Sequence, residues 1–344
     1  MRDSLRPLVW RGVVTLWVMA PLLGVWPGSS PKSGQLGWWV LASVLVVACG
    51  IGRAVRRTVP VFGWGVGAVL LVLASHLHGI GFALGWAYQS TLILIAAWLI
   101  AERGEWAWIR QAVIGVAWLQ VGLVILERFG VSLFPTAGAW PHGSLTTRTG
   151  VGILWLFASL WSPRRPAVIF TLLACLTGSW TAAFAVLALA WRYGQVTLPL
   201  LITVPVLLVV NSHLWWDKLA GRFDTWKRVY WLHDGWLTGW GFLPFPVGFI
   251  TTDPTGAVGT GTQVSIYLNN TWLDWVGRTG AIGALLMAGL LWVASRQLTT
   301  SWRVWTFFGL LWVGCWQSAE VLPVFSLLGV CSVLGWSHPS EARC

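Results

Sequence analysis

The stretch AWIRQAVIGVAWLQVGLVIL, residues 107–126, decides the kind of fold that this chain adopts. Its only ionisable side chain is Arg110, and the rest is almost entirely apolar. A helix of about 20 apolar residues crosses the hydrocarbon core of a bilayer, which is roughly 30 Å thick. We therefore predict a transmembrane helix at this position.

Similar apolar runs recur along the rest of the chain. Backbone amides in lipid must be hydrogen-bonded within their own segment, so each run is expected to be a helix. The sequence predicts an all-α fold: a polytopic transmembrane bundle of about 12 helices. Residues 1–344 form one membrane domain, and 212–270 form a large extracytoplasmic loop within it. The pair 166–176 and 180–191 has an alternative, one long helix bent at Gly178. The other runs are 8–26, 36–52, 60–78, 81–100, 149–161, 196–211, 271–294, 303–317 and 320–336.

Composition excludes a soluble domain. Hydrophobic residues make up 56% of the chain and charged residues only 10%, whereas soluble domains carry roughly 25% charged residues. The net charge is +11, but no run of Lys or Arg exceeds two residues. Nucleic acid is therefore not an expected partner. The five cysteines have no metal-ligand spacing, and we predict neither a disulfide framework nor a metal site.

The distribution of Lys and Arg sets the orientation in the membrane. If the N-terminus is cytoplasmic, every short basic loop falls on the cytoplasmic side, and so does the C-terminus. Merging 166–191 into one span would move the later basic loops outside. Tryptophan residues at the ends of the predicted spans are expected to anchor the helices at the membrane surface; they include Trp26, Trp38, Trp39, Trp106, Trp161, Trp191 and Trp302. Eight more lie between 212 and 275, Trp272 and Trp275 among them. Interface anchoring is our interpretation for most of these, with sugar stacking as an alternative for one or two.

Eight basic residues remain on the outer side, where the positive-inside rule disfavours them. They are either solvated loop charges or contacts for an anionic partner. Some lie in 222–233, where Asp224 and Arg228 are four residues apart and aromatic residues share one side. This pattern predicts an amphipathic helix at the outer membrane surface. It is either passive or turned toward a lipid-linked phosphate. The eight basic residues are Lys32, Arg128, Arg148, Lys218, Arg222, Lys227, Arg228 and Arg278.

A polar stripe opens the run at 271–294. Asn270, Asp274 and Arg278 are spaced four residues apart and would lie on one face of a helix. Ionisable residues at membrane depth are costly, and they usually face a partner or a cavity. Either Asp274 and Arg278 pair with each other, or the stripe lines an active-site cavity.

Three short patterns resemble the superfamily of O-antigen ligases and O-antigen polymerases. An outer-loop Arg is followed, after three intervening residues, by an apolar residue and then by a Gly-x-Gly turn. Next in the family comes a His-(Ser/Asn) pair. It is separated by nine residues from a Gly-x-x-Gly motif. Upstream, LLACLTGSWTAAFAVLALAW is similar to a family helix in which Arg is common at the position of Trp180. The matching residues here are Arg222 and Trp226, Gly239 and Gly241, Asn269 and Asn270, and Gly280 and Gly283.

This resemblance implies a metal-independent glycosyltransferase without a cofactor, in the bacterial inner membrane. It would transfer a glycan from a polyprenyl-diphosphate carrier to an acceptor hydroxyl on a glycan, a lipid or a protein. Guanidinium groups match phosphate geometry, so we expect the diphosphate at Arg222, Arg228, Arg148 and Arg278. The expected catalytic residues are Asn269, Asn270 and Asp274.

One departure from the family pattern affects the chemistry. Asn269 stands where the family has the His proposed to activate the acceptor, and an amide cannot act as a general base. Asp274, His233 and Asp224 are candidate substitutes, and the sequence does not choose among them. Two other functions stay open: a transporter or flippase for a lipid or an anionic solute, and an inactive relative that acts in polysaccharide assembly.

Overall fold

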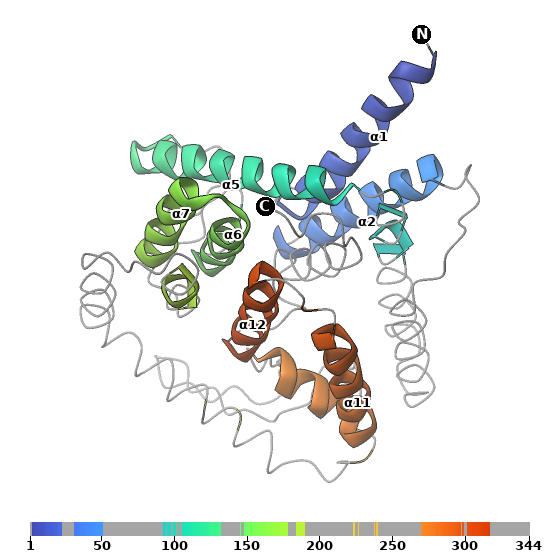
Figure 1. The fold of residues 1–344 in the computed structure, drawn as a ribbon, viewed down its shortest axis with the longest axis vertical. Helices are drawn as coiled ribbons and strands as arrows, with labels where there is room; N and C mark the ends of the chain where they lie inside the picture. The colour runs from blue at the N-terminus through green and yellow to red at the C-terminus, as the bar shows by residue number, and fades with distance from the viewer. Residues whose placement is uncertain are drawn as a thin grey trace, which may run out of the picture.

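All regular structure in the described part of the chain is helical, and that part contains no strand. The all-α class is therefore confirmed. The structure, a computed structural model, describes residues 2–22, 31–50, 92–93, 95–97, 99–100, 103, 105–131, 145, 148–177, 184–189, 223, 226, 237, 239, 270–296, 298 and 301–316. The expected spans at 60–78, 196–211 and 320–336 lie outside these residues. Figure 1 shows helices α1 Arg2–Met19, η1 Ala20–Leu22, α2 Pro31–Gly50, α5 Trp106–Arg128, α6 Arg148–Trp161, α7 Arg164–Leu176, α11 Thr271–Arg296 and α12 Ser301–Trp316.

Helix α5 is long and apolar enough to cross a membrane, and it is the one helix of the described residues that meets both conditions. Its 23 residues span about 34 Å at 1.5 Å per residue. One face packs into the protein through residues at three- and four-residue spacing, from Ile109 to Gln120. The other face exposes large apolar side chains, including Leu119 at 51% and Ile125 at 49%. Such a face suits contact with lipid, because exposed apolar area of this kind is unfavourable in water.

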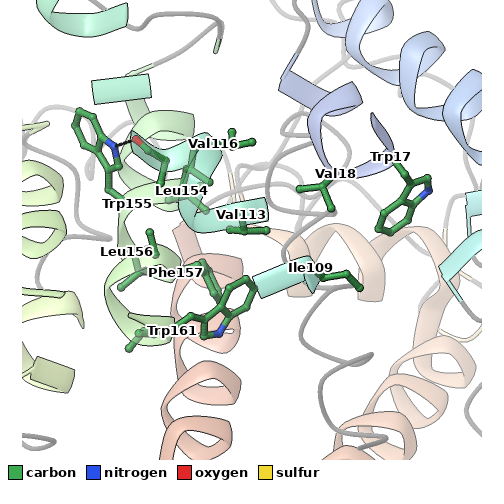
Figure 2. Packing of buried hydrophobic residues seen from close by; sticks show 14 of the residues in the cluster. Trp17, Val18, Ile109, Val113, Val116, Leu154, Trp155, Leu156, Phe157 and Trp161 are labelled. Carbon is green, nitrogen blue, oxygen red and sulfur yellow. Dashed lines mark hydrogen bonds between the residues drawn. The ribbon is translucent and has the colours of Figure 1, made fainter. Parts of the chain in front are cut away.

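Helix α6 forms the centre of the bundle. It contacts α5, α7 and α12, and every residue from Gly150 to Trp161 is buried. A helix that is apolar on all sides belongs in the interior of a protein. The indole Nε1 of Trp155 donates to the carbonyl oxygen of Ala117 in α5 at 3.2 Å. Figure 2 shows this bond and the core that α6 shares with α1 and α5.

Proline explains where the first helix ends. The apolar run extends to residue 26, but α1 ends at Met19 and a short 3-10 turn follows over Ala20–Leu22. Pro21 lies inside this turn. It has no N–H for an α-helical bond, and its ring clashes with the carbonyl four residues earlier. The helix therefore ends earlier than the hydrophobic pattern predicts.

Three tryptophans from distant parts of the sequence meet at one end of the bundle. Trp106 starts α5, Trp161 ends α6, and Trp302 lies at the start of α12. The ring centroids of Trp106 and Trp161 are 5.3 Å apart, and those of Trp106 and Trp302 are 5.7 Å apart and stacked. Trp161 Nε1 also donates to Thr306 Oγ1 in α12 at 3.1 Å. The ends of these three helices therefore lie at one level.

Two arginines connect the middle of α1 with the end of α2 and the start of α5. The guanidinium of Arg103 lies 3.6 Å from the ring centroid of Trp10 and donates to the carbonyl of Cys49 near the end of α2. Arg11 Nε lies 3.7 Å from a carboxylate oxygen of Glu105, directly before α5. Positive charge near the last carbonyls of α2 is favourable, because a helix C-terminus carries partial negative charge. These contacts join the first two helices to the start of α5.

Candidate functional site

Helix α11 is two helices joined by a break at Gly280. This residue has φ 66° and ψ −164°, which is not helical, and the two halves run in different directions in Figure 1. The sequence predicts one continuous helix over 271–294, and that prediction is wrong at this point. The first half, 271–279, is about 13 Å long at 1.5 Å per residue, which is too short to span a bilayer. Irregular backbone at membrane depth occurs where it is buried in protein or lines a cavity.

The break is a site of close backbone contact. A Cβ atom added at Gly280 would lie 2.6 Å from the backbone nitrogen of Gly239, and it would overlap the carbonyl oxygen of Leu237. Gly239 itself has φ 73°. Two separate features therefore exclude a side chain at position 280: the positive φ of its backbone, and the backbone atoms of Leu237 and Gly239 beside it. The structure thus brings together two glycines that the sequence pattern assigns to separate motifs.

Asn270 is the N-cap of α11. Its side chain is buried, and its Oδ1 accepts hydrogen bonds from the backbone N–H groups of Trp272 and Leu273, each at 3.0 Å. Asn is among the preferred residues for this position, because the cap satisfies N–H groups that have no partner within the helix. Asn270 therefore precedes α11 rather than sharing a helical face with Asp274 and Arg278. The oxygen of its amide is already engaged in starting the helix.

Trp272 anchors the first half of α11 to α12. Its Nε1 donates to the carbonyl oxygen of Leu311 at 3.1 Å. Its ring lies so close to Gly314 that a Cβ there would be 2.6 Å from the indole. Gly314 thus provides a flat surface for the ring. The start of α11 is fixed against the C-terminal part of α12.

Trp275 connects the two halves of α11 across the break. Its Nε1 donates to the carbonyl oxygen of Gly283 at 2.8 Å. Residues eight apart in a straight helix are separated by about 12 Å along the axis. This hydrogen bond is short because the helix changes direction at Gly280. It satisfies an indole N–H that would otherwise be unpaired in an apolar environment.

The half-helix 271–279 is therefore held by a cap, by α12 and by the second half of α11. Asp274 and Arg278 both belong to this half-helix, and their four-residue spacing lies before the break. The prediction that these two residues share a helix face therefore agrees with the backbone. Their pairing stays a prediction. Trp272 and Trp275 belong to the eight tryptophans between 212 and 275, for most of which the sequence favours interface anchoring, with sugar stacking as an alternative for one or two. The three neighbouring glycines, Gly277, Gly280 and Gly283, indicate a break in the sequence without fixing its position.

The remaining candidate residues are distributed as follows. Arg148 is the first residue of α6, at the end of that helix away from Trp161. Phe223 and Trp226 have helical backbone, and their ring centroids are 5.1 Å apart. The other residues of the expected amphipathic helix, including Arg222 and Arg228, lie outside the described residues, as does Asn269. Within the part of the chain that the structure describes, no three His, Cys, Asp or Glu residues are grouped to hold a metal ion.

Comparison with protein-family models, with curated proteins and with solved structures finds no match to this chain.

Proposed function

We propose that this chain is a membrane glycosyltransferase that transfers a glycan from a polyprenyl-diphosphate carrier to an acceptor hydroxyl, in the manner of O-antigen ligases and polymerases. The observation that supports this most is the contact of Gly239 with Gly280. These glycines belong to two separate parts of the pattern on which the resemblance rests. They meet beside the half-helix that carries Asp274 and Arg278.

In this proposal about 12 helices cross the cytoplasmic membrane, and both termini are cytoplasmic. Two observations support it: the apolar outer face of α5, and Arg103 beside the end of α2. Arginines are typical of the cytoplasmic ends of membrane helices. Cysteines introduced at Arg165 and at Val131 test the orientation. A membrane-impermeant reagent added outside should label position 131 alone, and labelling of position 165 would overturn the orientation.

The reaction needs a good leaving group and a well-placed nucleophile. The acceptor oxygen forms a bond to the anomeric carbon, the bond from that carbon to the diphosphate breaks, and the hydroxyl loses its proton. Negative charge grows on the departing diphosphate, so guanidinium groups that hold it lower the barrier. Arg222, Arg228, Arg148 and Arg278 have this role in the proposal. Their side chains would also fix the orientation of the donor.

The acceptor side of the reaction falls to the residues around the start of α11. Asn269 would orient the acceptor hydroxyl by hydrogen bonds without taking its proton. Asp274, one turn into the half-helix, is the carboxylate that we assign to receive that proton. Asn270 caps the helix and so sets where Asp274 stands. Anchoring by Trp272 and Trp275 keeps this arrangement fixed before substrate binds.

Reconstitution tests the proposal. Purified protein in lipid nanodiscs is given a polyprenyl-diphosphate glycan and a candidate acceptor, and glycan transfer is measured. Arg222→Ala should abolish transfer at an unchanged level of folded protein, and Arg222→Lys should restore only part of it, because Lys is a point charge rather than a fork. Arg164→Ala, at the exposed start of α7, is the matched control and should keep full activity. Full activity of Arg222→Ala would make that residue a solvated loop charge.

A transporter or flippase is the second candidate, and the break in α11 favours it. Discontinuous membrane helices frequently form substrate sites in transporters. The two functions differ in their products. A glycosyltransferase forms a new covalent bond between glycan and acceptor, whereas a flippase only moves a lipid between leaflets. Flipping of a fluorescent polyprenyl-diphosphate analogue without any glycan transfer would replace the glycosyltransferase proposal. Absence of both activities would favour an inactive relative.

A further inference from the structure

The hydrogen bond between Trp275 and Gly283 spans the break in α11 and joins its two halves. We infer that Trp275 is a positioning residue: its indole sets the angle between the two halves and thereby holds the half-helix 271–279 in place for the reaction. The inference rests on the proposed function, because it concerns the placement of Asp274 and Arg278 on that half-helix.

The backbone at Gly280 does not by itself fix the angle between the two halves of α11. A glycine such as Gly280 can adopt many backbone conformations that other residues cannot. The glycine therefore permits the bend without fixing its size. Gly283, three residues further on, has no side chain that could shield its carbonyl from the indole. The bond from Trp275 Nε1 to that carbonyl is 2.8 Å long and can form only over a narrow range of angles.

The contacts around the half-helix hold different parts of it. Trp272 fixes its start to α12 through Leu311 and Gly314. Leu237 and Gly239 press against the break itself. The hydrogen bond from Trp275 to Gly283 links the half-helix to the second half of α11. Loss of this bond should therefore let the half-helix turn about Gly280 while its start stays on α12.

A substitution that removes the indole N–H of Trp275 but keeps an aromatic ring tests the hydrogen bond separately from the packing of the ring. Trp275→Phe keeps an aromatic ring and deletes the N–H, and Trp275→His keeps a smaller ring with an N–H. Trp292→Phe is the matched control, because Trp292 lies in the same helix but is 62% exposed. A misplacement of about 1 Å can lower a rate by up to roughly 100-fold. We expect Trp275→Phe to lower kcat about 10-fold or more on the same grounds, with little change in KM.

The angle between the two halves of α11 and the rate of glycan transfer are measured separately. Spin labels at Leu273 and Ser295, in full-length protein with the native cysteines replaced, report the angle by pulsed electron spin resonance. The two positions would be about 33 Å apart in a straight helix, and a bend shortens this distance. The parent and Trp292→Phe should give one short, narrow distance distribution. Trp275→Phe should broaden or lengthen it, and Trp275→His should restore part of both the distance and kcat.

The outcomes are distinct. An unchanged distance distribution in Trp275→Phe overturns the inference, whatever the activity. A changed distribution with unchanged kcat also overturns it, because the angle would then have no bearing on the reaction. A parent protein that transfers no glycan overturns the proposed function and the inference with it, even if the distance changes. Changed distance, lowered kcat and partial rescue by His together support the inference.

Discussion

Replacing Gly280 by Ala should disrupt the junction between α11 and the segment around Gly239. The backbone at Gly280 has φ 66° and ψ −164°, a region that is essentially confined to glycine. Holding another residue there costs about 1–3 kcal/mol. The added Cβ would also overlap the carbonyl oxygen of Leu237 and lie 2.6 Å from the nitrogen of Gly239. Crowding of this kind typically costs a further 1–3 kcal/mol, or about 2–6 kcal/mol for the two effects together.

This cost is a substantial fraction of the stability of a domain, which is about 5–15 kcal/mol. The cheaper response is local, since moving the 237–239 segment away relieves the overlap and leaves α12 and the rest of the bundle intact. We therefore expect Gly280→Ala to reach the membrane at near-normal levels, to unfold at a lower temperature in detergent, and to lose glycan transfer. Tryptophan fluorescence on heating, together with the nanodisc transfer assay, measures both effects.

Gly289→Ala is the matched control for this experiment. Gly289 lies in the second half of α11, and a Cβ there meets nothing within 4 Å. In a regular helix Ala is favoured over Gly by up to about 1 kcal/mol, so this variant should be as stable as the parent or slightly more stable. If Gly280→Ala matches Gly289→Ala in unfolding temperature and activity, the break and its contact with residues 237–239 do not exist as described.

Three further predictions follow from the same region. Asn270→Ala should destabilise the start of α11 by about 1 kcal/mol, and Asn270→Ser should recover most of this; hydrogen exchange of the first turn measures it, and equal exchange in both variants would contradict the cap. Gly314→Val should displace the ring of Trp272 and lower the unfolding temperature, whereas Gly115→Val, with open space around it, should lower it much less. Asp274→Asn should reduce glycan transfer more than Asn269→Ala does, and the opposite order would exchange the roles of these two residues.

The helices that could be predicted are those whose ends are set by local chemistry. The runs at 107–126, 149–161 and 303–317 correspond to Trp106–Arg128, Arg148–Trp161 and Ser301–Trp316. Arginine, tryptophan or proline at their ends marks these boundaries in the sequence itself. Asn270 also carried a readable signal, because Asn directly before an apolar run is a typical N-cap. Its spacing to Asp274 and Arg278 favoured a different interpretation, a shared helix face.

The break at Gly280 could not be predicted from the local sequence. Gly277, Gly280 and Gly283 lie close together in the sequence, but each costs a helix only about 1 kcal/mol relative to Ala. The glycines alone therefore do not fix where, or whether, the helix breaks. What decides the matter is tertiary structure, the close approach of Leu237 and Gly239 from a segment about forty residues away. The link that Trp275 makes to Gly283 depends on that same break. Both features follow from contacts that no periodicity encodes.

The unusual number of tryptophans, 30 in the chain, has a second explanation beside surface anchoring. Several indole N–H groups reach a backbone carbonyl or a hydroxyl on another helix: Trp17 bonds Ser43, Trp155 bonds Ala117, Trp161 bonds Thr306 and Trp272 bonds Leu311. In the membrane bundle that we propose, lipid offers no water to satisfy an indole, so a donor that is bonded within the protein avoids the cost of an unpaired group. Hydrogen bonds between membrane helices are worth about 0.6 kcal/mol on average, which is small singly but additive over distant sites. Tryptophan therefore acts here as both an apolar core residue and a cross-link between helices, and α11 uses the same device to hold a helix that is broken in two.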